Sequence, residues 1–296
     1  MKRKKIRLRK KWIIVIILLT LSLGIIGKGF YLEPYSLKIK EYKISSKKLP
    51  LHFHGLKIVH LTDIHYGTTV KLKQLKTIVN NINLINPDIV VFTGDLIDKT
   101  TPFMATTEKE ITTELKKIKA TLGKYAIYGE HDYFCVSYTD ILAESNFILL
   151  NNTYDLIFHN EYEPIFIGGI NTFSKLDITS NIQQTISDFN KVDNEDDNII
   201  KPRYFIILMH MPDYTNLLLD NYQVDLILAG HSHNGQIKIP FKGGVLLPAG
   251  SKRYYQPYYQ INRTDLYISP GLGTTRLKVR FLNKPSFNLY RLTTIK

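Results

Sequence analysis

Short apolar runs alternate with helical patterns in the first half of the chain and predict alternating strands and helices. The runs "KIVHL", "DIVVF" and "KYAIY" each pass directly into polar residues, as buried strands do where they enter a loop. Between them, one stretch has apolar residues at helical spacing from Leu72 to Ile82 before Pro87, and "EKEITTELKKIKATLG" closes with Gly123. This order is typical of a parallel sheet with crossover helices.

The second half of the chain is richer in short strands. Candidates are "PIFIGGI", "RYFIILMH", "VDLILAGHSH", "DLYISPGLG" and "FNLYRL", with a helical stretch from Ile182 to Phe189 before the polar loop "NKVDNEDDN". No internal repeat of fixed period is found in the sequence. Residues 56–296 are therefore predicted to form one α/β domain, and the polar, lysine-containing stretch 33–55 is predicted to be a connector.

The N-terminal segment has the pattern of a membrane anchor. Residues 1–11 form a basic tail with eight basic residues and no acidic one, and residues 12–32 are uncharged except for Lys28. The run from Trp12 to Gly27, at about 1.5 Å per residue, is slightly short for a hydrocarbon core of about 30 Å, but flanking aromatic residues can lie in the interfaces. A single transmembrane helix over 12–32 is therefore predicted.

Two interpretations of this segment remain open, an uncleaved anchor and a cleaved signal peptide, because both have a charged start and an apolar middle. No A-x-A-like cleavage pattern follows the run, which favours the anchor. The basic tail is expected to stay in the cytoplasm by the positive-inside tendency. The prediction is a single-pass protein of the cell membrane whose domain lies on the extracytoplasmic side.

Composition and charge narrow the function classes. The 296 residues are 44% hydrophobic and 22% charged, as in a globular protein, and the formal net charge is +13. Subtracting the eight basic residues of 1–11 leaves +5, so most of the excess positive charge lies in the N-terminal tail. A role as a topology signal is sufficient to explain it there, and a nucleic-acid partner is therefore disfavoured. Cys135 is the only cysteine, so no internal disulfide can stabilise the fold, and burial as a small apolar residue is its expected role.

Five predicted strands are followed by loops that hold acidic and imidazole side chains. In a parallel or mixed sheet the carboxyl ends of the strands share one edge, so loops far apart in sequence converge there. One such loop would be a weak signal, but five in succession point to a joint site. The loops contribute Asp63 and His65 from "DIH", Asp95 and Asp98 from "GDLID", Glu130, His131 and Asp132 from "GEHD", His210 from "MHMPD", and His231 and His233 from "GHSH".

These residue types point to two divalent metal ions. Carboxylate and imidazole ligands without thiolate suit Mn²⁺, Fe²⁺ or Zn²⁺. A carboxylate such as Asp95 can bridge two metals about 3.5–4 Å apart, and the pair can hold a phosphate and lower the pKa of a bridging water, producing a metal-bound hydroxide for in-line attack on phosphorus. Glycines precede Asp95, Glu130 and His231, where they let the backbone turn sharply at the strand end.

The order and spacing of these loops resemble the calcineurin-like metallophosphoesterase superfamily, whose pattern is D-x-H, G-D-x-x-D, G-N-H-[DE], a lone H and G-H-x-H. The stretches "GHSHNGQIKIP", "LLPAGSKRY" and "LYISPGLGTTRLKVRFLNKP" also resemble its bacterial membrane-anchored branch, which includes phosphodiesterases and a lipid-sugar pyrophosphatase. The resemblance implies a two-sheet α/β sandwich flanked by helices, with a dinuclear metal centre at the strand ends.

Carried over position by position, the resemblance also implies a role for each side chain. His131 matches the histidine that assists the leaving group. Asp98 and Asp132 are expected to orient histidine ligands and not to bind metal themselves. The implied metal ligands are Asp63, His65, Asp95 and His233 on one ion, and Asp95, Glu130, His210 and His231 on the other.

Glu130 stands where the family has an asparagine. Glutamate keeps an oxygen donor but adds a methylene and a negative charge, so it can ligate a metal more strongly and also repel an anionic phosphate. The leading hypothesis is a membrane-anchored dinuclear-metal phosphohydrolase that cleaves a phosphodiester or pyrophosphate, with an envelope or lipid-linked compound as the candidate substrate. The alternatives are a metal-binding surface protein with little catalysis because of Glu130, and a nuclease of the same superfamily.

Overall fold

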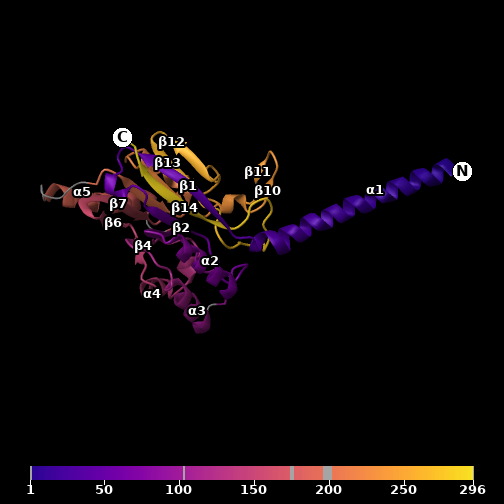
Figure 1. The fold of residues 1–296 in the computed structure, drawn as a ribbon, viewed down its shortest axis with the longest axis horizontal. Helices are drawn as coiled ribbons and strands as arrows, with labels where there is room; N and C mark the ends of the chain where they lie inside the picture. Colours follow the sequence, from indigo (N-terminus) through magenta and orange to yellow (C-terminus); the bar gives the residue numbers. More distant parts are fainter. Residues whose placement is uncertain (1, 103, 174–176, 196–201, 296) are drawn as a thin grey trace.

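The two main sheets of the protein have six strands each (Figure 1). The computed structural model describes residues 2–102, 104–173, 177–195 and 202–295. The first sheet has the order β1-β14-β2-β3-β4-β5 and the second β12-β13-β9-β8-β7-β6. Most neighbouring strands are parallel, and the pairs β14–β2, β12–β13 and β6–β7 are antiparallel.

The strands of the first sheet are β1 (Lys38–Ser46), β2 (Lys57–Leu61), β3 (Ile89–Phe92), β4 (Gly123–Ala126), β5 (Ile148–Leu149) and β14 (Ser286–Thr294). Those of the second are β6 (Thr153–His159), β7 (Glu161–Ile170), β8 (Phe205–Met209), β9 (Leu226–Ala229), β12 (Tyr258–Ile261) and β13 (Thr264–Ile268). A two-stranded hairpin pairs β10 (Lys238–Ile239) with β11 (Gly243–Gly244). The helices are α1 (Lys2–Gly27), α2 (Leu72–Ile85), α3 (Ala105–Leu115), α4 (Tyr138–Glu144), α5 (Ile178–Glu195) and α6 (Thr215–Leu219).

The sheets pack face to face, and helices cover their outer faces. The apolar core between the sheets combines residues such as Val91 of β3 and Ile206 of β8. A second core joins the outer face of the first sheet to α2, α3 and α4, and a third joins the second sheet to α5 and α6. All four residues of β3 are buried because the strand has apolar neighbours on both faces. The predicted two-sheet sandwich flanked by helices is confirmed.

The end of the chain adds a strand inside the first sheet, and the expected connector supplies its edge. Strand β14 lies between β1 and β2, and β1 pairs with it in parallel from Lys38↔Ser286 to Ser46↔Thr294. The stretch 33–55 was predicted as a connector because β1 is polar and lysine-rich. Within β1 itself, most residues remain at least partly exposed and only Ile44 is buried, as an edge strand allows.

Two helix predictions need correction at their ends. Helix α3 covers 105–115, whereas the pattern placed it over 108–123. Helix α5 continues to Glu195 through most of the polar segment predicted as a loop from Asn190, and positions 196–198 of that loop lie outside the described residues. A polar composition is compatible with the solvent-facing side of a helix, so it did not distinguish helix from loop here.

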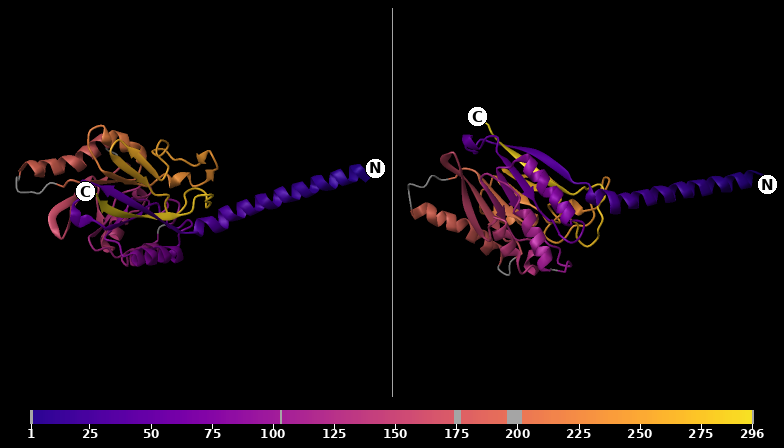
Figure 2. Two further views of the ribbon diagram at one scale, coloured as in Figure 1. Left: turned by 45° about the horizontal axis from the view of Figure 1, so that its top comes forward. Right: turned by 60° about the horizontal axis from the view of Figure 1, so that its bottom comes forward.

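The N-terminal helix stands away from the body in all views (Figures 1 and 2). Its apolar segment continues through short turns to Tyr35, with a mean hydropathy of 2.4 over the most apolar part of Lys11–Tyr35, and its side chains are largely exposed. By length and composition it can cross a bilayer, although a leader peptide has the same properties. In the last turn of this segment, Glu33 is buried and accepts a hydrogen bond from the Asn283 backbone N–H at 2.8 Å, which connects this end of the helix to the domain.

Candidate metal centre

The loops after β2, β3, β4, β8 and β9 bring the predicted site residues to one edge of the sandwich. Many of these residues adopt a left-handed backbone conformation, which non-glycine residues rarely do. They are Asp63 (φ 49°), His65 (φ 41°), Asp95 (φ 61°), His231 (φ 63°) and His233 (φ 47°). Such conformations persist only where the surroundings hold them, and they concentrate at functional sites.

Two glycines let these loops approach each other closely. A Cβ on Gly129 would lie 2.3 Å from Asp95 Oδ1, and a Cβ on Gly230 would lie 2.0 Å from Thr62 Oγ1 and 2.7 Å from Asp63 Oδ2. No side chain fits at such distances, so the convergence of the loops requires glycine at both positions.

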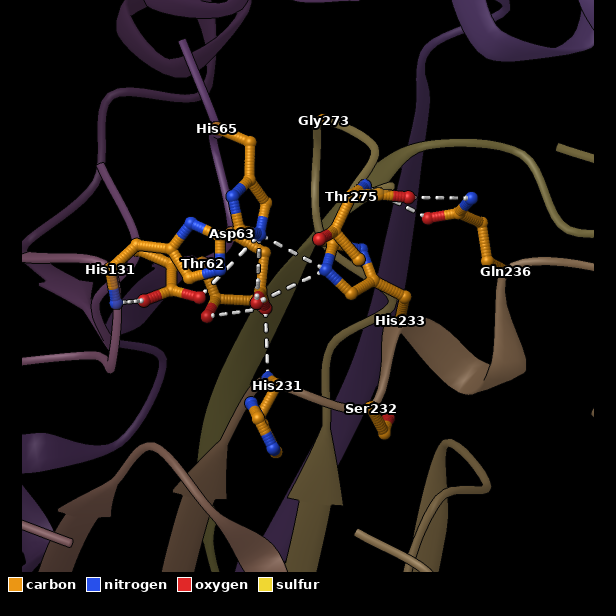
Figure 3. Close-up of polar contacts among 12 residues, drawn as sticks. Thr62, Asp63, His65, His131, His231, Ser232, His233, Gln236, Gly273 and Thr275 are labelled. Atoms are coloured by element: carbon orange, nitrogen blue, oxygen red, sulfur yellow. Dashed lines mark hydrogen bonds and ion pairs between the residues drawn. The ribbon is translucent and has the colours of Figure 1, made fainter. Parts of the chain in front are cut away.

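A first group of donor atoms consists of Asp63, His65 and His233, all buried (Figure 3). His65 Nε2 lies 3.1 Å from His233 Nε2, and Asp63 Oδ1 lies 3.7 Å and 3.4 Å from the two nitrogens. A metal bound at about 2.1 Å keeps its ligand atoms about 3.0–3.4 Å apart. The triangle of donors therefore has nearly the right size for one metal ion.

A second group consists of Asp95, His210 and His231. Asp95 Oδ2 lies 3.3 Å from His210 Nε2 and 3.5 Å from His65 Nε2, so this carboxylate faces both groups. His210 Nδ1 donates to the Thr93 carbonyl at 2.6 Å, and His231 Nε2 donates to the Ala249 carbonyl at 2.7 Å. These bonds leave the other nitrogen of each ring free to bind a metal.

Unsatisfied buried atoms fit the same interpretation. Among the described residues, Asp63 Oδ1 and His210 Nε2 are buried without a hydrogen-bond partner. An unmade hydrogen bond on a buried polar atom costs about 1–3 kcal/mol, so such atoms are rare unless another partner binds there. Both atoms belong to the donor groups, and a divalent metal would satisfy them.

The electrostatics of the cluster keep its charges balanced. Burial alone would lower the pKa of His65 and His210, but hydrogen bonds and charges of the neighbouring aspartates outweigh it and raise both to about 10. Burial favours the neutral form of Asp95, yet His210 and His65 hold its pKa below the usual range. These shifts favour protonated histidines beside ionised aspartates, and bound metal ions would replace the histidine protons.

Two aspartates brace the site in different ways. Asp98 Oδ2 lies 3.5 Å from Nδ1 of both His65 and His131, the place expected for a residue that orients histidines. Asp132 was also expected to orient a histidine, but its carboxylate accepts the backbone N–H groups of Asp95, Leu96 and Gly129, each at 2.8 Å. It therefore fastens the loop after β4 to the loop after β3. Burial, with the charge of Asp95, raises the pKa of Asp132 to about 7.

Glu130 and His131 lie beside the donor groups. His131 Nδ1 accepts the Lys99 backbone N–H at 3.1 Å, and its Nε2 lies 3.5 Å from Glu130 Oε1. The hydrogen bond to His131 lowers the pKa of Glu130 against the opposing effect of burial. His131 forms a third donor group with His65 and Asp95, whereas none of the three groups found among the described residues includes Glu130.

Arg280 is a site residue that sequence reasoning missed. Its guanidinium is fully buried, donates to the carbonyls of Pro270 at 2.9 Å and Gly271 at 3.1 Å, and lies 3.3 Å from His233 Nδ1. Burial lowers the pKa of His233 well below its usual value, and the charges of His65 and Arg280 add to this against the effect of Asp63. The imidazole is thus kept neutral, as a metal ligand must be. The only sequence signal was the stretch "LYISPGLGTTRLKVRFLNKP", where one of four basic residues does not stand out from solvent-exposed charges.

Comparisons with known proteins agree with this geometry. The sequence pattern of the calcineurin-like phosphoesterases matches residues 56–235. The metallophosphoesterase YkuE of Bacillus subtilis is 33% identical over 269 residues, which cover 90% of this chain and 89% of that protein. The UDP-2,3-diacylglucosamine pyrophosphatase LpxG of Chlamydia trachomatis is 27% identical over 305 residues, covering 88% and 91%. A transmembrane protein with metallophosphoesterase domain of Danio rerio is 27% identical over 254 residues, covering 83% and 55%.

Proposed function

This chain belongs to the calcineurin-like phosphoesterase family and is a hydrolase, and from that premise we propose that it cleaves a phosphodiester or pyrophosphate bond at a dinuclear metal centre. The observation that carries the proposal is the position of Asp95 Oδ2, 3.5 Å from His65 Nε2 and 3.3 Å from His210 Nε2. A carboxylate that lies within reach of two sets of donor atoms is suited to bind two neighbouring metal ions.

The proposed ligands follow the two donor groups. Asp63, His65 and His233 would hold one ion, His210 and His231 would hold the other, and Asp95 would contribute to both. Glu130 completes the second set by a turn of its side chain, which is 29% exposed and not fixed in the core. Bound divalent metals would supply Lewis-acid polarisation of a phosphoryl oxygen and lower the pKa of a water nucleophile. Mn²⁺, Fe²⁺ and Zn²⁺ all suit this donor set.

His131 is proposed to assist the leaving group. Its Nδ1 accepts the backbone N–H of Lys99, which leaves Nε2, 3.5 Å from Glu130 Oε1, as the ring nitrogen that can donate a hydrogen bond. A hydrogen bond donated from Nε2 can stabilise the negative charge that develops on a departing oxygen. The hydrogen bond from Lys99 fixes the orientation of this ring, and Asp98 Oδ2 lies 3.5 Å from the same nitrogen, Nδ1.

A lipid-linked or other envelope phosphate ester is the proposed substrate. The N-terminal helix would hold the catalytic domain at a membrane surface, and the relative from Chlamydia trachomatis is by name a pyrophosphatase for a diacylated sugar nucleotide. A membrane-anchored hydrolase can reach a substrate in the same membrane without that substrate first dissolving in water. An anchored enzyme is therefore suited to a lipid-linked substrate.

The test is hydrolysis by the full chain in detergent or in lipid discs with added Mn²⁺. We expect turnover of a nitrophenyl phosphodiester and of a nucleotide-linked pyrophosphate, and loss of both activities with a chelator. Preference for DNA or RNA would instead favour the nuclease alternative. Absence of turnover with every divalent metal would contradict the proposal.

Replacing Glu130 by Asn distinguishes an active site from a degenerate one. We expect Glu130→Asn to keep the fold and some activity, to change metal affinity or preference, and to tighten inhibition by inorganic phosphate, because one negative charge beside the anion is removed. Metal titration and phosphate inhibition measure these effects, and Glu130→Gln is the matched control that removes the charge at constant length. An inactive natural protein that gains hydrolysis only as Glu130→Asn would support the metal-binding alternative.

The proposed topology places the basic tail 1–11 in the cytoplasm and the domain outside. We expect a β-lactamase fused after Lys296 to protect cells from ampicillin, since that reporter acts only beyond the cytoplasmic membrane. The same fusion lacking residues 1–32 is the control and should give no protection. A fusion without protection despite normal expression would refute the orientation, and a soluble, shortened product would favour the signal peptide.

A further inference from the structure

Two loops of the domain lie at the base of the N-terminal helix. They comprise residues 237–245, which form the hairpin β10–β11, and residues 275–284, and together they are called the junction surface below (Figures 1 and 2). The Arg280 N–H donates to the Gly29 carbonyl at 3.0 Å, and the Lys238 N–H donates to the Phe281 carbonyl at 2.9 Å. The two loops are therefore bonded to each other and to the end of the helix.

The junction surface exposes an unusual number of large apolar side chains. Phe241 at the tip of the hairpin is 111% exposed relative to an extended reference, and Leu277 in the second loop is 52% exposed. Isolated exposed apolar residues are common on soluble proteins, but a group on one surface marks a contact with another apolar phase or partner. The exposed apolar residues of this surface are Ile239, Phe241, Val245, Leu277 and Leu282.

Positive charge surrounds these apolar tips. Besides the buried Arg280, the two loops contain five basic residues, Lys238, Lys242, Arg276, Lys278 and Lys284, and no acidic one. Lys40 of the adjoining edge strand is affected by this charge: burial lowers its pKa to about 8, with the charges of Lys238 and Arg280 acting in the same direction. The mild net charge of the body thus conceals a local concentration of cations beside the helix.

We propose that the junction surface docks on the anionic lipids of the bilayer that the N-terminal helix crosses. Apolar tips surrounded by lysine and arginine, without carboxylates, are the composition of segments that lie in a membrane interface. The hydrogen bonds to Gly29 and Glu33 hold the surface at the end of the apolar segment, where the headgroups would be. A protein partner would not need to lie at that level, so the bilayer is the occupant that the position favours.

Docking in this way would also orient the metal centre, a consequence that rests on the proposed function. A pocket of about 220 Å³ is lined by Leu246 and Leu247, which follow the hairpin, by Thr275 and Arg276 of the second loop, and by His233 of the first donor group. Figure 3 shows Thr275 and Gln236 next to His233. A phosphate ester attached to a membrane lipid would then enter beside an apolar wall and a cation.

The experiment places a fluorescent reporter on single cysteines of the full chain in vesicles. Cys135 is the only natural cysteine and is buried, so Cys135→Ala provides the background. Phe241→Cys and Leu277→Cys report on the junction surface. Phe158→Cys, 53% exposed on β6 at the far end of the domain, is the matched control, and Leu18→Cys reports on the helix itself. The vesicles contain nitroxide-labelled lipids, with or without anionic phosphatidylglycerol.

We expect the nitroxide lipids to remove roughly half or more of the emission at positions 241 and 277, because interfacial apolar side chains lie about 5–10 Å into the headgroup boundary. The loss should be smaller without anionic lipid and after Lys242→Glu with Lys278→Glu, and absent at position 158. If the reporter at position 18 is quenched and those at 241 and 277 are not, the helix crosses the bilayer but the docking proposal is wrong. A reporter at position 241 that is shielded from water but not quenched by the nitroxide lipids would indicate a contact with protein, and would also contradict docking on the bilayer.

Failure of the membrane span and failure of hydrolysis are separate outcomes. If the reporter at position 18 is not quenched, the helix does not cross the bilayer, and the docking proposal is refuted as well. Hydrolysis of the soluble nitrophenyl phosphodiester by the unlabelled chain is measured in the same vesicles. A result against docking with hydrolysis intact leaves the proposed activity standing.

Discussion

Asp95→Asn is expected to abolish hydrolysis, with a fall in turnover of at least about 10³-fold. Bound metal ions stabilise the transition state by several kcal/mol, and each 1.4 kcal/mol of lost stabilisation lowers the rate about tenfold. Asp95 Oδ2 faces His65 and His210, while Oδ1 accepts the His131 backbone N–H at 2.8 Å. Asparagine keeps an oxygen for that hydrogen bond but loses the charge that two cations would share. The fold should therefore survive while the site loses metal.

The measurement combines turnover with metal content per chain and a thermal melt. Asp220→Asn, the same chemical change at an exposed position, should leave turnover and metal content unchanged. Full activity of Asp95→Asn with two metals bound would refute the dinuclear arrangement. A variant that loses both activity and its melting transition would show only that Asp95 is needed for folding, so Asp95→Glu, which keeps the charge, is measured beside it and should retain metal.

His131→Ala is expected to lower turnover by about 10²- to 10⁴-fold with metal content retained, as for loss of a general acid. The expected loss is smaller for nitrophenyl esters than for alkyl diesters, because a good leaving group needs no proton. His131 also lies in a donor group with His65 and Asp95, so metal analysis is an essential part of the experiment.

Two contrasting results would identify other roles for His131. An equal loss of turnover for substrates with good and poor leaving groups would exclude His131 as the general acid. Loss of one metal ion per chain would identify His131 as a metal ligand. His54→Ala is the matched control, because His54 is exposed and, within the described residues, its side chain hydrogen-bonds only to Thr294 at the end of β14. Its turnover should equal that of the natural protein.

Much of the candidate site could be predicted from local pattern alone. An apolar run that ends in Asp-x-His or Gly-His-x-His encodes both a buried strand and the loop that follows it, and parallel pairing then brings such loops to one edge. The structure places Asp63, Asp95, His210 and His233 together in this way. Their roles as ligands stay predictions until metal is measured.

Tertiary structure decided the features that have no local pattern. Asp132 fastens two loops through backbone N–H groups, and Glu130 lies against His131 outside the donor groups, because both depend on where other loops place their atoms. Arg280 reaches His233 from a lysine-rich segment that resembles solvent-exposed chain. The contacts of Asp132 with Asp95 and of Arg280 with His233 join residues 37 and 47 positions apart, and a sequence carries no periodic signal for them.

The sequence by itself determined the alternation of strands and helices, the apolar N-terminal helix and the chemistry of the strand-end loops, because each follows from the side chains of a few neighbouring residues. Only the tertiary structure decided that β1 joins the first sheet through β14, and that two basic, apolar-tipped loops lie beside the helix end. Pairing between the two ends of the chain depends on packing over the whole domain, and a polar edge strand shows no apolar run that would reveal it.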